Sequence, residues 1–163
     1  MNNKFNVLPA SSRIWIYQAS RKLRESEEVE ITEKAGRFVK TWNAHGNDLE
    51  AGAIILHNQF LVLGVNEDQN GASGCSIDKS FRFIKQLEKD YKLRFLERSK
   101  VAFYIDNEVA LFPLAELKLK IDAGTITKDT LIFNNLVDNK GDLEDKWIIP
   151  ANDSWFKKYF LAN

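Results

Sequence analysis

Residues 50–65 read Glu50-Ala-Gly-Ala-Ile-Ile-Leu-His-Asn-Gln-Phe-Leu-Val-Leu-Gly-Val65. Two apolar runs, Glu50–Leu56 and residues 60–65, lie on either side of the short polar link at 57–59. Apolar runs of this length are typical of β-strands, and a link this short joins neighbouring antiparallel strands. The segment therefore predicts a β-hairpin, around which the other elements can be placed.

A strand and a helix are predicted before this hairpin. Arg13–Gln18 alternates between two faces, as a strand does. The helix begins in the acidic stretch 25–30, where negative charge complements the helix dipole. Its apolar residues recur at helical spacing as far as Trp42, and Gly46 is a plausible stop.

A second helix and a second strand pair are predicted after the hairpin. The loop at 66–75 is rich in turn-forming residues, and Ser76 or Asp78 can cap the helix that follows. The strand pair comprises residues 101–105 and 109–112. The helix has five apolar residues at helical spacing, namely Ile77, Phe81, Ile84, Leu87 and Tyr91.

The first six elements thus have the order strand, helix, strand, strand, helix, strand. This is the ferredoxin-like βαββαβ arrangement, an α+β sheet with two covering helices. We expect a single domain over residues 1–163, with a ferredoxin-like core at 1–105 and a C-terminal α/β extension at 106–163. The tail at 147–160 contains five aromatic residues, so we expect it to pack back on the domain.

Composition excludes several classes of function. The 163 residues include 23 basic and 23 acidic side chains, so the usual positive charge of a nucleic-acid-binding protein is missing. A single cysteine cannot form an internal disulfide. The apolar runs are too short to cross a bilayer, and the first nine residues have no signal-peptide core. We expect a cytoplasmic protein with no membrane span and no nucleic-acid partner.

The predicted topology brings two chemistry-bearing residues to one end of the domain. The first helix ends near His45, and the loop before the second helix contains Cys75. Backbone N–H groups at the start of a helix stabilise negative charge. Cys75 is therefore a candidate nucleophilic or redox thiol, with His45 as its base and Asp48 or Asp78 to orient the imidazole.

Each of these residues also has a structural interpretation, which we favour. A lone cysteine commonly packs as a small apolar side chain, and a histidine at a helix end commonly hydrogen-bonds the last carbonyls. A metal site built from His45, Cys75, Asp48 and Asp78 lacks any paired Cys or His spacing, so we expect no metal.

The glycine-rich loop before the second helix does not match a nucleotide-binding motif. No lysine follows Gly74 at the position that a Walker A loop requires. Backbone amides around Gly74 and Ser76 could hold a small anion, with Trp42 and Asp48 as further candidate ligand-binding residues. Trp42 also fits the end of the apolar helix face.

The charge-dense segments, residues 25–30 and 85–92, are interpreted as solvated helix faces. Within the second of them, Lys85 and Lys92 lie three and four positions from Glu88. This spacing is typical of surface pairing between opposite charges.

Five segments of the chain carry distinctive motifs: Arg13-Ile-Trp-Ile-Tyr-Gln18, Trp42-Asn-Ala-His-Gly-Asn-Asp-Leu49, Gly74-Cys-Ser-Ile-Asp78, Phe133-Asn-Asn-Leu-Val137 and Trp147-Ile-Ile-Pro-Ala-Asn-Asp-Ser-Trp155. The pairing of Trp-x-x-His-Gly with Gly-Cys-Ser-Ile-Asp is the most specific of these features. Together the segments resemble an uncharacterised protein family of the Bacteroidetes. Members are often labelled ABC transporter ATPases, a label that this sequence does not support, since it contains neither a Walker A nor a Leu-Ser-Gly-Gly-Gln motif. The resemblance implies a bacterial protein and carries over no catalytic residue.

Two hypotheses of function follow. The first is a non-catalytic binding or interaction protein, which recognises another protein or a small-molecule anion and forms a homodimer through its sheet or its aromatic tail. The alternative is a thiol-dependent enzyme that uses Cys75 with His45. Neither hypothesis requires a cofactor.

Overall fold

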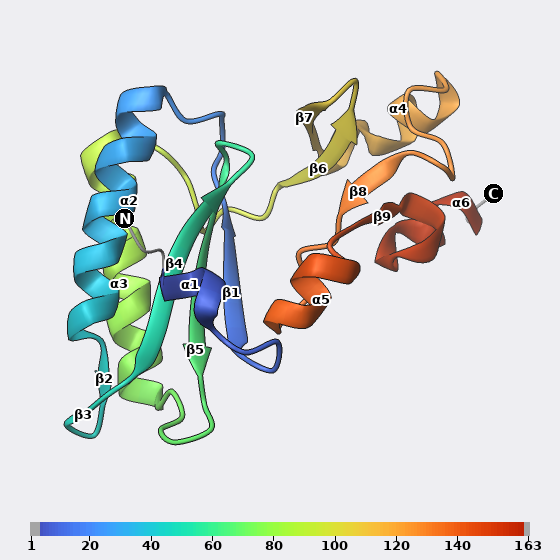
Figure 1. The fold of residues 1–163 in the computed structure, drawn as a ribbon. Coiled ribbons are helices and arrows are strands. Elements are labelled where there is room, and N and C mark those ends of the chain that lie inside the picture. The colour runs from blue at the N-terminus through green and yellow to red at the C-terminus, as the bar shows by residue number, and fades with distance from the viewer. Residues whose placement is uncertain (1–3, 162–163) are drawn as a thin grey trace. The chain divides into compact units, whose positions relative to one another are not determined.

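The computed structural model describes residues 4–161 and has a mixed α+β architecture, as predicted (Figure 1). The chain forms two compact units. Unit 1 contains the residues up to Leu96 together with the returning segment Asp138–Gly141. Unit 2 contains Glu97–Val137 and the residues from Asp142 onward.

Unit 1 is built on a three-stranded antiparallel sheet. The strands β1 (Arg13–Gln18), β5 (Phe60–Asn66) and β4 (Glu50–Leu56) have the spatial order β1-β5-β4. Two long helices, α2 (Glu25–Thr41) and α3 (Gly74–Tyr91), cover one face of this sheet. These five elements match the sequence prediction in kind and order.

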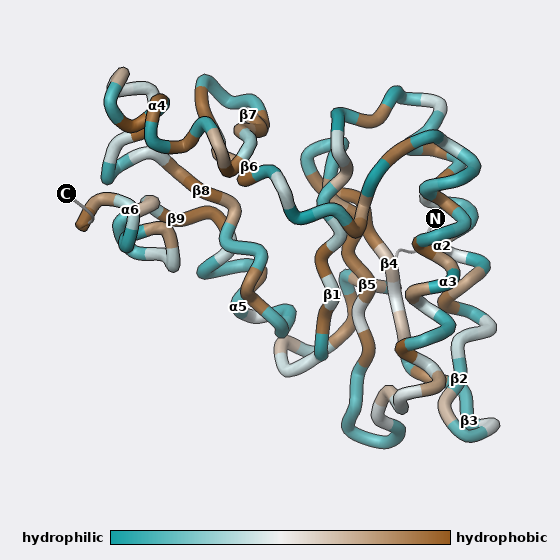
Figure 2. The backbone as a smooth tube through the Cα atoms, turned by 180° about the vertical axis from the view of Figure 1, so that it is seen from behind, coloured by the Kyte–Doolittle hydropathy of each residue, from teal (hydrophilic) through white to brown (hydrophobic). Residues whose placement is uncertain are grey.

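The main core of unit 1 lies between the sheet and the two helices. Leu61 and Leu63 of β5 are fully buried there against Ile31 of α2 and Ile84 of α3. The central strand β5 is apolar along most of its length, and the outer faces of the helices are hydrophilic (Figure 2). Removing this apolar surface from water is the main stabilising contribution to unit 1.

The opposite face of the sheet carries the short helix α1 (Lys4–Val7). A side chain at Gly52 would lie 2.4 Å from the backbone nitrogen of Phe5, and one at Gly64 would lie 2.9 Å from the Phe5 ring. Glycines at these two paired positions therefore allow α1 to approach the sheet closely.

The hairpin predicted from residues 50–65 is confirmed. Its two turn residues, His57 and Asn58, both have positive φ angles, as a type I′ turn requires. A smaller hairpin that the sequence analysis missed, β2 (Asn43–Ala44) and β3 (Asn47–Asp48), follows α2.

The expected four-stranded ferredoxin-like sheet is not confirmed, because the fourth strand lies in another sheet. Strand β6 (Lys100–Ile105), expected beside β1, pairs with β7 (Glu108–Pro113) and β8 (Leu131–Phe133) in unit 2. Its tight turn to β7 makes that pairing local, with a short loop to close. The outer edge of β1 is instead met at its start by residues 138 and 139.

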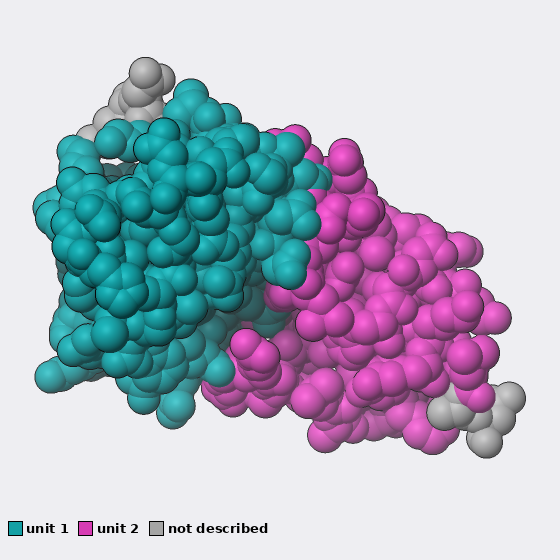
Figure 3. Space-filling view, turned by 90° about the horizontal axis from the view of Figure 1, so that it is seen from below, with its two compact units in different colours: residues 1–96, 138–141 teal, residues 97–137, 142–163 magenta. Residues whose placement is uncertain are grey.

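Unit 2, magenta in Figure 3, contains a four-stranded sheet. The strand order is β7-β6-β8-β9, where β9 is Ile148–Pro150. The short helices of unit 2 are η1 (Leu114–Glu116), α4 (Leu117–Asp122), η2 (Ala151–Asp153), η3 (Trp155–Lys157) and α6 (Lys158–Leu161). The helix α5 (Lys140–Asp145) begins in the returning segment of unit 1 and continues into unit 2. The aromatic tail is packed, as predicted: Phe156 is fully buried, and its ring contacts Phe103 edge to face at 5.2 Å between centroids.

Candidate functional site

Cys75 lies in the first turn of α3, where its side chain is exposed to solvent. The helix is capped by Ser73, not by Ser76 or Asp78 as predicted: the Ser73 hydroxyl accepts a hydrogen bond from the Ser76 amide at 3.2 Å. The Ser76 hydroxyl in turn accepts from the Ser73 amide at 2.6 Å and is buried. Because this reciprocal cap occupies Ser76, Ser76 has a structural role. The interpretation of Cys75 as a buried core residue is wrong.

His45 lies at the turn of the β2–β3 hairpin, with a φ of 52° and an exposed side chain. This hairpin is attached to the start of α3. Lys79 donates a hydrogen bond to the side-chain oxygen of Asn43 at 2.8 Å, and the Trp42 indole donates to the Ser76 carbonyl at 2.8 Å. The β2–β3 hairpin, which carries His45, and the start of α3, which carries Cys75, therefore lie at the same end of unit 1, as the topology predicted (Figure 1).

The candidate residues nevertheless do not form a catalytic constellation. Within the described part of the chain, no hydrogen bond or ion pair joins Cys75, His45 and Asp78. Asp78 faces solvent, with 73% of its side chain exposed, and its nearest cationic group is Arg82 at 4.0 Å. Asp48 is also exposed; it pairs with Asn43 in the β2–β3 hairpin, and its backbone carbonyl accepts a hydrogen bond from Asn70 at 3.5 Å.

Trp42 and Gly74, two of the candidate ligand-binding residues, show no feature specific to ligand binding. Trp42 is 1% exposed, and its ring packs against Trp15 and Phe38 in the core of unit 1. Gly74 is exposed, and a side chain there would meet no atom within 4 Å, so no close approach to another group requires glycine at this position.

The glycine-rich loop already holds an anionic group from the protein itself. The carboxylate of Glu67 accepts a hydrogen bond from the Ala72 amide at 2.9 Å and lies 3.9 Å from Arg13. This internal carboxylate places negative charge beside the loop, where a second anion would be repelled. Across residues 4–161, no group of three His, Cys, Asp or Glu side chains has an arrangement that could hold a metal ion.

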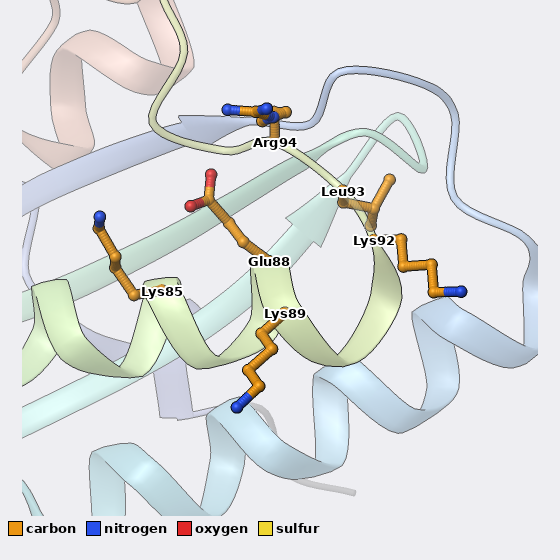
Figure 4. Close-up of a pocket in the computed structure, with 6 residues that line it drawn as sticks. All are labelled: Lys85, Glu88, Lys89, Lys92, Leu93 and Arg94. Carbon is orange, nitrogen blue, oxygen red and sulfur yellow. The ribbon is translucent and has the colours of Figure 1, made fainter.

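A different surface of unit 1 concentrates positive charge. A depression of about 470 Å³ at the end of α3 is lined by six residues, of which four are basic and one is acidic. We call the four basic residues, Lys85, Lys89, Lys92 and Arg94, the α3 basic surface (Figure 4). All four are exposed, and none forms an ion pair with an acidic side chain in the described residues.

The single acidic residue of this depression forms no ion pair with its basic neighbours in the described residues. The sequence analysis expected Glu88 to pair with Lys85 and Lys92, and this is wrong. The Glu88 carboxylate instead accepts hydrogen bonds from the backbone amides of Phe95 at 2.7 Å and Leu96 at 3.1 Å. Charged acceptors of this kind are strong, and they fix the chain as it leaves α3.

The α3 basic surface was missed because residues 85–92 were interpreted as an ordinary solvated helix face. One signal in the sequence could have revealed it: three lysines, Lys85, Lys89 and Lys92, recur close together at the end of the predicted helix. Like charges this close together are mildly destabilising for the helix. Near the C-terminal end of a helix this repulsion is offset by the helix dipole, which favours positive charge there.

No family model, curated protein or solved structure matches this chain. A helix both long enough and apolar enough to cross a bilayer is not found among residues 4–161.

Proposed function

We propose that this chain is a non-catalytic interaction protein that uses the α3 basic surface to bind an acidic segment of a partner protein. The observation that carries the proposal is the group of four exposed basic side chains around one depression, none of which forms an ion pair with an acidic side chain in the described residues. Clustered charge of one sign attracts an oppositely charged partner and raises its rate of association.

The directions of the basic side chains favour an extended partner over a single small anion. In Figure 4, Lys85 and Arg94 lie on the side of Glu88, whereas Lys89 points toward α2 and Lys92 points away along the end of the helix. Side chains that diverge in this way contact several charges of a longer segment at once. A nucleic acid is disfavoured, since the chain as a whole has no excess of positive charge.

The test is the binding of a fluorescently labelled oligo-glutamate peptide, measured by anisotropy at low and at physiological salt. The key variant replaces Lys85, Lys89 and Lys92 with Gln. Each exposed ionic contact contributes about 0.2–1 kcal/mol, so losing three should weaken binding about tenfold. The control replaces three exposed lysines of unit 2, Lys118, Lys128 and Lys157, with Gln and changes the net charge equally.

Weaker binding in the α3 variant alone would support the proposal. Equal losses in both variants would show that only the overall charge matters, and no binding at low salt would contradict the proposal directly. Inorganic phosphate as competitor separates the two partner classes: displacement of the peptide at a stoichiometric concentration would favour a small anion instead.

A thiol-dependent enzyme is the second candidate, supported by the exposure of Cys75 at the start of an 18-residue helix. Its test is the rate of Cys75 alkylation against pH in the native protein and in His45→Ala. Alkylation of Cys75 that is fast at neutral pH and slower in His45→Ala would support catalysis. A rate no faster than that of a free cysteine, whose pKa is about 8.5, would remove this candidate.

The proposal keeps three further expectations from the sequence. We infer a bacterial protein of the Bacteroidetes family described above, located in the cytoplasm. We also infer that unit 1 is a ferredoxin-like arrangement without its fourth strand. The strand order β1-β5-β4 supports this inference, since it is the order of the first three strands in that fold.

A further inference from the structure

Strand β1 shows which backbone groups of the sheet in unit 1 face outward. Successive residues of a strand direct their N–H and C=O groups alternately to its two sides. The Ile14 amide donates to the carbonyl of Asp138 at 2.9 Å. The backbone N–H and C=O groups of Ile14 therefore point away from β5. The backbone N–H and C=O groups of its cross-strand neighbour Gly64 therefore point toward β4, where Gly64 pairs with Gly52.

The same alternation leaves the far edge of β4 open. The backbone groups of Gly52 point toward β5. Because the direction alternates along the strand, Ala53 and Ile55 direct their N–H and C=O groups out of the sheet. No backbone hydrogen bond from residues 4–161 reaches either of them on that side. The side chains of residues 53–56 are half-buried.

The sequence of this edge lacks the residues that normally prevent two sheets from pairing. Exposed edge strands are commonly protected by lysine, proline or a bulge. From Ala51 to Leu56, β4 contains no charged residue and no proline, and its register with β5 is continuous. The other edge of the sheet differs, because β1 begins with Arg13 and is covered there by Asp138 and Asn139.

We propose that the β4 edge pairs with β4 of a second copy of this chain, antiparallel and about a two-fold axis at Ile54. In this register Ala53 of each copy lies opposite Ile55 of the other, and the outward backbone groups of both residues are satisfied. The two sheets become one continuous sheet of six strands.

The strand is self-complementary in charge as well as in hydrogen bonding. Its single charged residue, Glu50, stands at its first position and accepts a hydrogen bond from Asn66 at 2.7 Å. Antiparallel pairing places the two copies of Glu50 at opposite ends of the new interface, so they do not repel each other. A two-fold interface requires this kind of self-complementarity. The inference is independent of the α3 basic surface.

The first test is the molar mass in solution by light scattering across a wide range of concentration. We expect a dimer that dissociates on dilution. Ile54→Lys places two like charges opposite each other at the axis and should weaken the dimer at least about tenfold. Ile16→Lys is the matched control, because it makes the same change in the edge strand on the other side of the sheet.

The second test does not depend on how well Ile54→Lys folds. Paired residues in a non-hydrogen-bonded antiparallel site have Cα atoms about 4.5 Å apart, which suits a disulfide. Ile54→Cys in a Cys75→Ser background should cross-link as a dimer under mild oxidation. The native protein, with its exposed Cys75, gives the rate of random collision.

Cross-linking of Ile54→Cys at least about tenfold faster than that of the native protein would support the interface. A monomeric mass at every concentration would overturn the proposal, as would a dimer that Ile54→Lys leaves intact or a cross-linking rate equal to that of the native protein. The binding of oligo-glutamate would be unaffected by any of these results, so the two proposals fail separately.

Discussion

Among single residues, Glu27 at the start of α2 has the strongest electrostatic surroundings. Arg21 donates two hydrogen bonds to its carboxylate, at 2.8 and 2.9 Å, and the Arg24 amide donates a third at 2.9 Å. These donors, with the Arg21 hydrogen bonds as the largest cause, lower the pKa of Glu27 to about 2. Its side chain is only 9% exposed, so the ion pair is partly shielded from water.

We predict that this carboxylate makes the protein sensitive to acid. A lowered pKa in the folded state contributes stability above about pH 4.5, and that stability is lost as the pH falls toward 2. The shift corresponds to about 3 kcal/mol at most, and screening at the half-exposed Arg21 reduces this to about 2 kcal/mol. Glu27→Gln should lose this amount at pH 7, as measured by urea unfolding.

The same experiment between pH 5 and pH 2 supplies the check. The native protein should lose more stability over this range than Glu27→Gln does, because the amide does not titrate. Parallel curves for the two proteins would show that Glu27 is not the acid-sensitive group.

The sequence predicted the location of the candidate residues better than their surroundings. Element order alone placed His45 and Cys75 at one end of unit 1. The position of Trp42 on the apolar helix face was predicted, but neither its hydrogen bond to the Ser76 carbonyl nor the use of Glu88 by backbone amides could be predicted. Both contacts join residues that only tertiary packing brings together, and a polar side chain has the same sequence signature whether it faces water or a buried amide.

At the scale of elements, two glycines in regular structure have opposite roles. Gly52 in β4 is required by the approach of α1, since a side chain there would collide with the backbone of Phe5. Gly36 lies inside α2, and a side chain at that position would meet no atom within 4 Å. A glycine without such a contact weakens its helix by comparison with alanine.

We therefore predict that alanine at these two positions changes stability in opposite directions. Gly36→Ala should raise the free energy of unfolding by about 0.5–1 kcal/mol. Gly52→Ala should lower it by about 1–3 kcal/mol, because α1 must move away from the sheet. Chemical denaturation measures both, and a neutral Gly52→Ala would mean that α1 shifts at no cost.

The elements themselves could largely be predicted from the sequence, but their assembly could not. Periodicity and turn residues identified β1, α2, β4, β5 and α3, and they also identified the hairpin of β6 and β7. Those signals are local, because each of them extends over only about ten residues. The sheet that β6 joins depends on its pairing with β8, which follows later in the chain, and no local pattern contains that information.

At the scale of the whole molecule, the chain leaves unit 1 after Leu96 and returns to it at Asp138–Gly141. The returning segment is held by several contacts. The Lys140 ammonium donates to the carbonyls of Asn6 and Leu8 at 3.0 and 2.8 Å, and the Lys140 amide donates to Ser12 at 2.9 Å. One lysine thus fastens the segment that connects α1 to β1.

We predict that Lys140→Met loosens the segment between α1 and β1. Hydrogen bonds from a charged donor contribute about 1.5–3 kcal/mol. Amide exchange at Leu8 and Ser12 should therefore be at least about tenfold faster, and exchange in the buried strand β5 should change less. Lys128→Met, at an exposed position of unit 2, serves as the control, and equal exchange in both variants would contradict the prediction.

The interrupted course of the chain has a consequence for synthesis on the ribosome. Once residues up to Leu96 have emerged from the ribosome, the nascent chain already contains every strand and long helix of unit 1, and it can begin to collapse. The outer backbone at the start of β1 then lacks its partner until residues 97–137 have also been made and Asp138 emerges. Until then each growing polypeptide exposes two bare sheet edges, and neighbouring chains on a polysome could pair through either of them. The speed at which residues 97–141 are translated therefore determines how long the nascent protein is open to that error.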